Sequence, residues 1–127
     1  AKTHEGGIAT PFIAWFPQRF KKGVISHVPG HITDIMPTLA ESAKTEYPER
    51  FEGKQIKPKQ GMSLLPVFEG PGTDTLRTFY FEHMGNCAVI EGDLKVVKRR
   101  DQDWELYNIR KDRSETNNLI EKNPGIA

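Results

Sequence analysis

A polar segment that passes through two adjacent glycines into a long apolar stretch opens this 127-residue chain. Gly6 and Gly7 allow the backbone a positive φ or a close approach to another group. The apolar residues 8–16, ended by Pro17, have the length and composition of a buried strand. Loops that lead into core strands often carry functional side chains. The pattern therefore predicts a strand over residues 8–16, with site residues directly before it.

Helical spacing of apolar side chains follows further along the first half of the chain. Residues 35–43 carry this spacing, with Thr33 or Asp34 available as a cap and Pro37 in the first turn. Residues 61–68 form a short apolar segment, which indicates one or two helical turns. We therefore expect one helix and one shorter helical segment, joined by polar, irregular chain.

The second half changes to the composition of strands separated by turns. Its β-rich segments are residues 78–83, 87–90, 94–98 and 104–109. Their close spacing predicts an antiparallel meander of four strands. Residues 114–122 resemble a short helix, capped by Ser114 or Thr116 and ended before Pro124, that packs on this sheet. The strand predicted over residues 8–16 has no βαβ partner in the chain, so its neighbours must lie elsewhere.

Charge and composition exclude several classes of function. A net charge of +1 is too small for a nucleic-acid module, and no apolar run reaches the length of a membrane span. The basic residues 98–100 lie beside Asp101 and Asp103, which favours a solvated strand end. Cys87 is the one cysteine, lies in an apolar run and reads as a packed thiol. We expect no nucleic-acid partner, no membrane partner and no signal peptide.

Five segments, in order, resemble the type I sulfatases, the arylsulfatase family of the alkaline-phosphatase superfamily. Residues 3–17, THEGGIATPFIAWFP, are similar to the segment of that family that contains Glu-Gly-Gly. The other four segments are HITDIMPTLAESA, GMSLLPVFEG, FYFEHMGNCAVIEGDLKVVKRR and WELYNIRKDRSETNNLIEKNP. Because the similarity is collinear over nearly the whole chain, no single motif has to carry it.

The resemblance implies a C-terminal portion of such an enzyme. Residues 1–45 would end the large α/β domain, residues 46–76 would connect, and residues 77–127 would form the small C-terminal domain. The expected fold class is α+β. It consists of a four-stranded antiparallel sheet with a packed C-terminal helix, preceded by the last strand and helix of the larger α/β sulfatase domain.

The family hydrolyses sulfate monoesters with a formylglycine made from Cys or Ser in a C/S-x-P-x-R motif, together with calcium. Cys87 is followed by Ala88 and Val89, so it does not match that motif. The calcium-binding Asp and Asn residues of the family lie outside the matched segments. The resemblance therefore implies that formylglycine and calcium belong to the intact enzyme, that this chain holds no metal, and that the chain alone is inactive.

The resemblance also suggests residues that bind substrate near the start of the chain. The family's sulfate-binding Lys lies five residues before the Glu of Glu-Gly-Gly, whereas Lys2 lies three before Glu5. Lys2 is therefore either a sulfate contact or a solvated terminal lysine. His4 takes the position of an aromatic or His beside the site, where a packing role is equally compatible. Glu5 is expected to hydrogen-bond backbone and hold the loop.

A second group of candidate contacts lies in the turn after the first strand of the meander. His83 and Asn86 occupy a turn that resembles the family's EHEGN segment, which would reach the substrate. Met84 and Cys87 replace the usual Glu and Arg there, and a strand-end role for His83 stays open. The spacing of His27 and His31 is broken by Pro29 and Gly30, so a helical zinc pair is not expected.

Alternatives remain open at this level. The chain is either part of a sulfatase, part of a phosphonate or phosphodiester hydrolase of the same superfamily, or a free-standing, non-catalytic binding module. For the sulfatase, the expected partners are the missing N-terminal domain and a sulfated small molecule or sulfated glycan. A homo-oligomer through residues 8–16 is also expected, because an unpaired apolar strand is an association template. The resemblance favours a periplasmic or secreted location.

Overall fold

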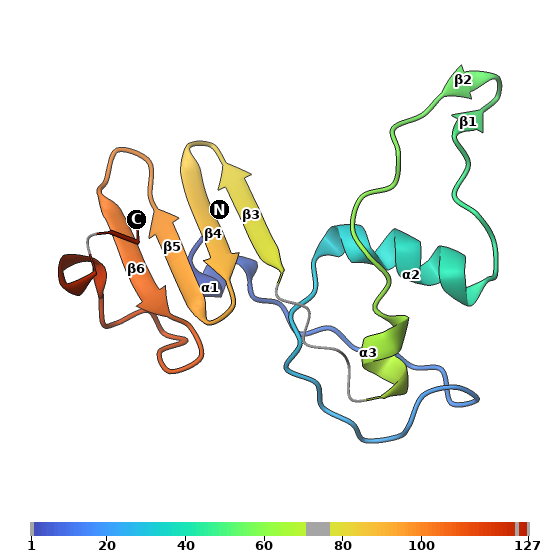
Figure 1. The fold of residues 1–127 in the computed structure, drawn as a ribbon, viewed down its shortest axis with the longest axis horizontal. Helices are drawn as coiled ribbons and strands as arrows, with labels where there is room; N and C mark the ends of the chain where they lie inside the picture. The colour runs from blue at the N-terminus through green and yellow to red at the C-terminus, as the bar shows by residue number, and fades with distance from the viewer. Residues whose placement is uncertain (1, 71–76, 124, 127) are drawn as a thin grey trace. The chain divides into compact units, whose positions relative to one another are not determined.

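A computed structural model of the chain describes residues 2–70, 77–123 and 125–126. The chain divides into two compact units, residues 1–12 with 75–127 and residues 13–74. Figure 1 shows the β-rich unit and the helical unit along the chain. The first unit contains both ends of the sequence, so the polar N-terminal segment belongs with the sheet and not with the helices that follow it.

Four antiparallel strands form the sheet of the first unit. They are β3 (Thr78–His83), β4 (Asn86–Glu91), β5 (Leu94–Lys98) and β6 (Trp104–Asn108), in the spatial order β3-β4-β5-β6. The tight turn between β3 and β4 places Met84 at φ 52° and Gly85 at φ 83°. Positive φ at both turn residues matches the right-handed twist of a hairpin. The predicted meander and the α+β class are confirmed.

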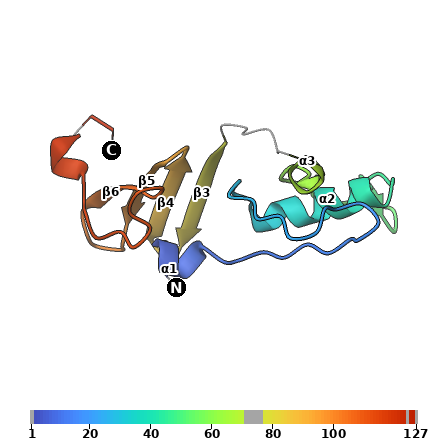
Figure 2. The same cartoon turned by 90° about the horizontal axis from the view of Figure 1, so that it is seen from below.

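Strand register divides the sheet side chains between two faces. Phe79, Ile90, Lys95 and Tyr107 form one row across the four strands. Because side chains alternate, Ala88 and Val97 belong to the same face in the next row. These two residues and Tyr107 form the buried cluster of this face. The short helix α1 (Glu5–Ile8) and the residues before it cover the face, as Figures 1 and 2 show.

The C-terminal tail borders β6 but does not form the predicted helix over residues 114–122. Its one regular element among the described residues is the 3-10 turn η2 (Ile120–Lys122). The Asp112 carboxylate accepts hydrogen bonds from the backbone N–H groups of Thr116 and Asn117 at 2.9 and 2.8 Å. Glu115 has a φ of 53°, which no right-handed helix accommodates. Side-chain capture of the backbone therefore replaces helical hydrogen bonding here.

The second unit contains the predicted helix and a small hairpin. The 3-10 turn η1 (Ile32–Asp34) leads into α2 (Ile35–Ser42), and α3 (Leu65–Glu69) follows the hairpin of β1 (Arg50–Phe51) and β2 (Lys54–Gln55). Asp34 is fully buried and accepts hydrogen bonds from the N–H groups of His31 and Met62 at 2.7 and 3.0 Å. It thereby ties the start of the helical region to the segment before α3.

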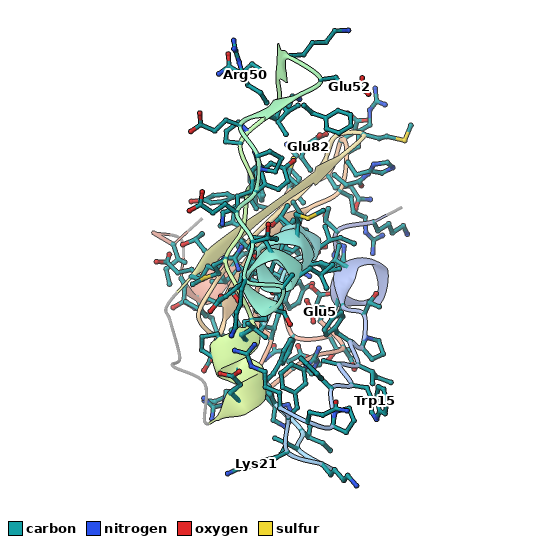
Figure 3. All side chains as sticks on the ribbon, turned by 90° about the vertical axis from the view of Figure 1, so that its right-hand side faces the viewer. Glu5, Trp15, Lys21, Arg50, Glu52 and Glu82 are labelled. Atoms are coloured by element: carbon teal, nitrogen blue, oxygen red, sulfur yellow. The ribbon has the colours of Figure 1, made fainter. Side chains whose placement is uncertain are left out.

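The strand predicted over residues 8–16 is not present. Ile8 ends α1, and residues 9–16 have no regular secondary structure. Ile13 and Trp15 are 88% and 84% exposed, and Trp15 projects outward in Figure 3. An extended segment becomes a strand only beside a hydrogen-bonding neighbour, and no strand within the described part of the chain pairs with it.

No helix among the described residues is long and apolar enough to cross a bilayer.

Candidate functional site

His4 is held on the sheet by a carboxylate from β6. Its Nε2 lies 2.7 Å from Oε2 of Glu105, and its side chain is 15% exposed. Its ring meets the ring of Tyr107 edge-on, with centroids 6.5 Å apart. Its Nδ1 is buried without a hydrogen-bond partner among the described residues. These contacts favour the packing role of His4 that the sequence left open.

Glu5 enters a buried ion cluster on the same face of the sheet. Its Oε1 lies 3.0 Å from Nζ of Lys95, which also lies 2.8 Å from Oε1 of Glu115. Arg113 reaches Oε2 of Glu5 at 3.2 Å. The backbone N–H of Glu5 donates to Oε2 of Glu115 at 2.7 Å. Glu5 does hold the loop, but through these charged side chains and not through the backbone hydrogen bonds that we expected of its carboxylate.

Of the two adjacent glycines, Gly7 permits a close approach of the backbone, and neither has a positive φ. A Cβ on Gly7 would lie 2.9 Å from the carbonyl carbon of Lys2 and closer still to its oxygen, whereas a Cβ on Gly6 would meet nothing within 4 Å. The N–H groups of Gly7 and Ile8 both donate to the carbonyl of His4, at 2.8 and 3.2 Å. The chain thus folds back tightly over Gly7, with the exposed Lys2 at the start of the turn.

His83 and Asn86 face each other across the β3–β4 hairpin. They are partners in the strand register, and Nδ2 of Asn86 donates to the carbonyl of His83 at 2.9 Å. Oδ1 of Asn86 accepts from the backbone N–H of Arg100 at 3.3 Å. A Cβ on Gly85 would lie 3.2 Å from the Arg100 side chain. The Asn86 amide is therefore engaged in holding the turn, while the side chain of His83 is exposed.

The register brings three of the four predicted site residues to one face of the sheet. His83 and Asn86 form the row next to Phe81 and Ala88, and Ala88 pairs in turn with Val97. The row of Phe81 and Ala88 continues through Val97 to Glu105 on β6. Glu105 is the residue that binds His4. At strand spacing, β3 and β6 lie about 14 Å apart. The candidates therefore line a common face without direct contact between His4 and His83.

The sequence reasoning missed the charged residues that organise this face. Lys95, Glu105 and Glu115 were not singled out, although they bind Glu5 and His4. The sequence around Lys95 carries no signal of this role. Ile90 and Tyr107 flank Lys95 in the strand register, which places its side chain on the inward face, but that register is visible only in the folded sheet. A lysine on the inward face requires a carboxylate partner, and the partner of Lys95, Glu5, lies 90 positions away in the chain.

Burial and neighbouring carboxylates also act on Tyr107. Its side chain lies under the N-terminal segment and is 6% exposed. Burial, together with the charges of Glu105 and Glu115, raises the pKa of Tyr107 to about 12. The phenol therefore keeps its proton throughout the physiological range, and it stands among these carboxylates as a neutral group.

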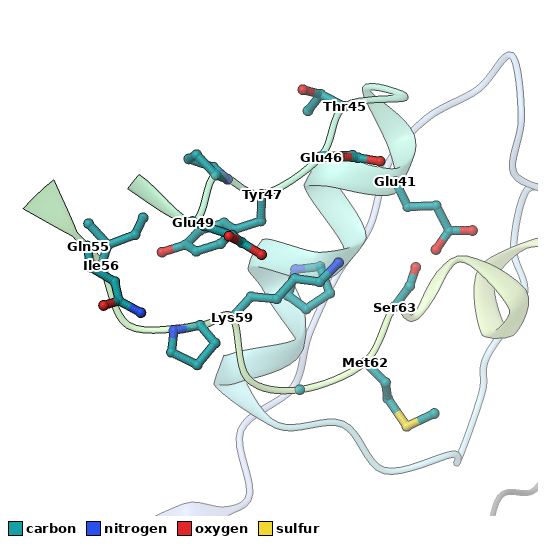
Figure 4. A pocket seen from close by; sticks show the side chains of 14 residues that line it. Glu41, Thr45, Glu46, Tyr47, Glu49, Gln55, Ile56, Lys59, Met62 and Ser63 are labelled. Atoms are coloured by element: carbon teal, nitrogen blue, oxygen red, sulfur yellow. The ribbon is translucent and has the colours of Figure 1, made fainter. Parts of the chain in front are cut away.

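A separate hollow lies in the second unit, between α2 and the chain that follows it (Figure 4). Glu41, Lys59 and Ser63 are among the side chains on its wall. Its charged lining groups are exposed, so no buried polar group there would be completed by a ligand. We assign no site to it.

No family model matches the chain. Comparison with individual proteins is more informative. An uncharacterized sulfatase of Schizosaccharomyces pombe is 30% identical over 129 residues, covering 96% of this chain and 23% of the relative. N-acetylgalactosamine-6-sulfatase of Canis lupus familiaris is 32% identical over 93 residues, covering 73% of this chain and 17% of the relative.

A solved structure extends this similarity to the fold. BT4656, in complex with its substrate D-glucosamine-2-N,6-O-disulfate, aligns with a TM-score of 0.64 at 25% identity. The alignment covers 87% of this chain and 24% of that one. The chain belongs to the sulfatase family. It matches the C-terminal portion of these proteins and spans about a quarter of the length of the fission yeast relative and of BT4656.

The described residues were also compared with the calcium and formylglycine chemistry expected of the family. No group of three or more His, Cys, Asp or Glu among them could hold a metal ion. Cys87 is half-buried on β4, and its carbonyl accepts a hydrogen bond from Oγ1 of Thr3 at 3.1 Å. We therefore derive no step through calcium or formylglycine from these residues.

Proposed function

We propose that this chain is the C-terminal part of a sulfuric ester hydrolase that cleaves sulfate monoesters. The observation that carries the proposal is the match with a sulfatase over 96% of the chain. The nucleophile, formylglycine, and calcium would come from the rest of the whole protein. The chain alone would then be inactive, because it lacks the C/S-x-P-x-R motif.

Within this proposal, the face that carries His4 and His83 contributes to substrate binding. His83 would contact the part of the substrate remote from sulfate, because its side chain is exposed beside a turn fixed by Asn86. Asn86 would act mainly by shaping that turn. Lys2 would contact sulfate only if the chain before it brings the group close. His4 would support the segment on which Lys2 lies.

The substrate class we propose is a sulfated glycan. The names of the relatives support this choice, since they include an ulvan-active sulfatase of Formosa agariphila and the canine N-acetylgalactosamine-6-sulfatase. BT4656 was likewise solved with a disulfated glucosamine. A sugar of this kind offers hydroxyl groups beyond the sulfate, which a polar turn such as that of His83 and Asn86 could hydrogen-bond.

We further propose that the remainder of the sulfatase domain covers the exposed apolar residues 9–16. Ile13 and Trp15 are almost fully exposed in this chain, although large apolar side chains are usually buried. Self-association through the same segment is the competing outcome for the isolated chain. A location outside the cytoplasm would suit an enzyme of sulfated glycans.

The test uses the whole protein and the isolated chain side by side. Whole protein should hydrolyse an aryl sulfate and a sulfated glycan, whereas the purified chain should not exceed buffer. Hydrolysis of a phosphodiester or phosphonate, but not of any sulfate ester, would point to the sister chemistry. A whole protein without hydrolysis of either kind would make the chain part of a binding protein.

A substitution at His83 tests the role of the turn. His83→Ala in the whole protein should lower kcat/KM for the glycan by roughly 10- to 100-fold, because a lost hydrogen bond to a remote substrate part costs about 1–3 kcal/mol. The small aryl sulfate should be nearly unaffected. His27→Ala, at another exposed histidine, is the matched control. Equal losses on both substrates would assign His83 to structure or to the sulfate pocket.

A further inference from the structure

Lys95 is a fully buried lysine in the middle of the sheet. It lies on β5 between Ile90 and Tyr107, and its side chain has no exposure. A buried ammonium is costly unless carboxylates pair with it. Such a group cannot touch substrate, so its contribution must act through the residues that it binds.

Those residues come from two distant parts of the chain. Glu5 belongs to α1, near the N-terminus, and Glu115 to the turn after β6. Nζ of Lys95 lies within 3.0 Å of a carboxylate oxygen of each. The Glu5 N–H also donates to Glu115 at 2.7 Å, which closes the arrangement. One ammonium therefore holds both segments against the sheet.

We propose that Lys95 is a positioning residue that fixes residues 3–8 on the sheet of the small domain. The role in catalysis rests on the proposed sulfatase function, in which this segment carries His4 and leads to Lys2. If the segment lifted, Lys95 would lose Glu5, one of its two carboxylate partners, and its buried charge would be left with Glu115 alone. The ion cluster opposes movement of the segment more strongly than the pair of Glu5 with the largely exposed Arg113 could alone.

Two further contacts also hold the segment on the sheet. Oγ1 of the buried Thr3 donates to the carbonyl of Cys87 at 3.1 Å, and His4 pairs with Glu105. Thr3 and His4 directly precede Glu5 in sequence, and their partners lie on β4 and β6. Lys95 on β5 lies between them, so it is the central of three anchors. Its loss should free the segment while leaving the strand ladder intact.

The experiment compares Lys95→Met with Lys98→Met in the whole protein. Lys98 lies on the same strand, on the opposite face, and is half-buried over the ring of Trp104. In Lys95→Met, hydrogen exchange at the amides of Gly7, Ile8 and Ala9 should accelerate about 100-fold, as expected when a buried charge pair is broken. Amides of β3 and β4 should keep most of their protection, and Lys98→Met should change neither set.

Kinetics provide the second measurement. If the segment positions substrate groups, Lys95→Met should lower kcat/KM for a sulfate ester by about 10- to 100-fold, with Lys98→Met near wild type. Glu5→Gln, which leaves Lys95 paired with Glu115, should produce the same pattern in smaller measure. It also keeps the proposal testable if Lys95→Met does not fold.

The outcomes separate this proposal from the proposed function. Equal acceleration of exchange over the segment and the strands would mean a general loss of stability and would overturn the positioning role. A freed segment with unchanged kinetics would overturn it as well. If the wild-type protein hydrolyses no sulfate ester, the proposed function fails, and the exchange pattern alone decides whether Lys95 holds the segment.

Discussion

The adjacent glycines offer a sharp test, because the structure predicts opposite effects for the same substitution. Gly6→Ala places a methyl group in open space within α1, whereas Gly7→Ala drives it into the backbone of Lys2. Ala is favoured over Gly in a helix by about 0.5–1 kcal/mol. Gly6→Ala should therefore be neutral or stabilising by up to that amount.

For Gly7→Ala the conformational gain is overwhelmed by the clash. The added Cβ would lie 2.9 Å from the carbonyl carbon and 3.4 Å from the nitrogen of Lys2, so backbone and not a flexible side chain must move. Overpacking of this kind costs about 1–3 kcal/mol. Relief by lifting the segment would break the pair of Glu5 with Lys95, which costs about 3–5 kcal/mol. We expect Gly7→Ala to be destabilising by about 1–3 kcal/mol.

Urea denaturation followed by tryptophan fluorescence measures the difference. Trp15 lies outside the sheet unit, so a Trp15→Phe background leaves Trp104 of β6 as the reporter. The two Ala variants should differ by about 1–4 kcal/mol in free energy of unfolding, with Gly7→Ala the less stable. Equal effects at Gly6 and Gly7 would refute the tight turn over Lys2 and the anchoring argument that depends on it.

Three further predictions follow from the described contacts. The pKa of Tyr107 is raised to about 12, so its stabilising contribution is complete below pH 10 and is lost as pH rises from about 10 to 12. Tyr107→Phe should remove the corresponding phase from a spectrophotometric titration and flatten the fall in stability. Backbone N–H groups of Asn117 and Thr116 lower the pKa of Asp112, so its contribution is present at neutral pH and lost as pH falls below about 4. Asp112→Ala should therefore speed hydrogen exchange at those two amides at pH 7, with a smaller effect as the pH falls and the wild-type carboxylate gains its proton. Ile13→Asp with Trp15→Asp should reduce self-association of the isolated chain in light scattering, and an unchanged mass would argue against this segment as the contact.

The sheet was predictable because its information is local. Each strand between Thr78 and Asn108 pairs with the next one along the chain, and the first two turns carry a glycine at positive φ, Gly85 and Gly92. The helix over residues 35–42 was predictable for the same reason, since its apolar spacing and Pro37 lie within one element. The division into residues 1–45, 46–76 and 77–127 stays a prediction.

The segment over residues 8–16 shows where local information ends. An apolar run has no preferred structure of its own when the neighbour that would hydrogen-bond to it is missing. At the start of this segment, the ion pair of Glu5 with Lys95 holds the chain on the sheet. Helix α1 forms at that anchor, and the apolar residues beyond it remain exposed.

The tail failed as a helix for a different physical reason. Its candidate caps, Ser114 and Thr116, are residue types that cap helices. Asp112 precedes them, however, and its carboxylate accepts the backbone N–H groups of Thr116 and Asn117. Glu115 adopts a left-handed conformation, and its backbone geometry brings the carboxylate to Lys95 at 2.8 Å. Helical propensity is worth only tenths of a kcal/mol per residue, so a buried ion pair outweighs it.

The same imbalance explains why the candidate site was only half visible in the sequence. Motif residues such as His4 and His83 are conspicuous in the chain, yet their placement depends on Glu105, Lys95 and Asn86. Those three residues have ordinary neighbours in the sequence. Glu105 and Lys95 lie 90 or more positions from the residues that they bind, His4 and Glu5. A charged residue in a strand signals a solvated edge unless its distant partner is known. Only the folded register turns Lys95 from an apparent surface lysine into the centre of the face that carries the site.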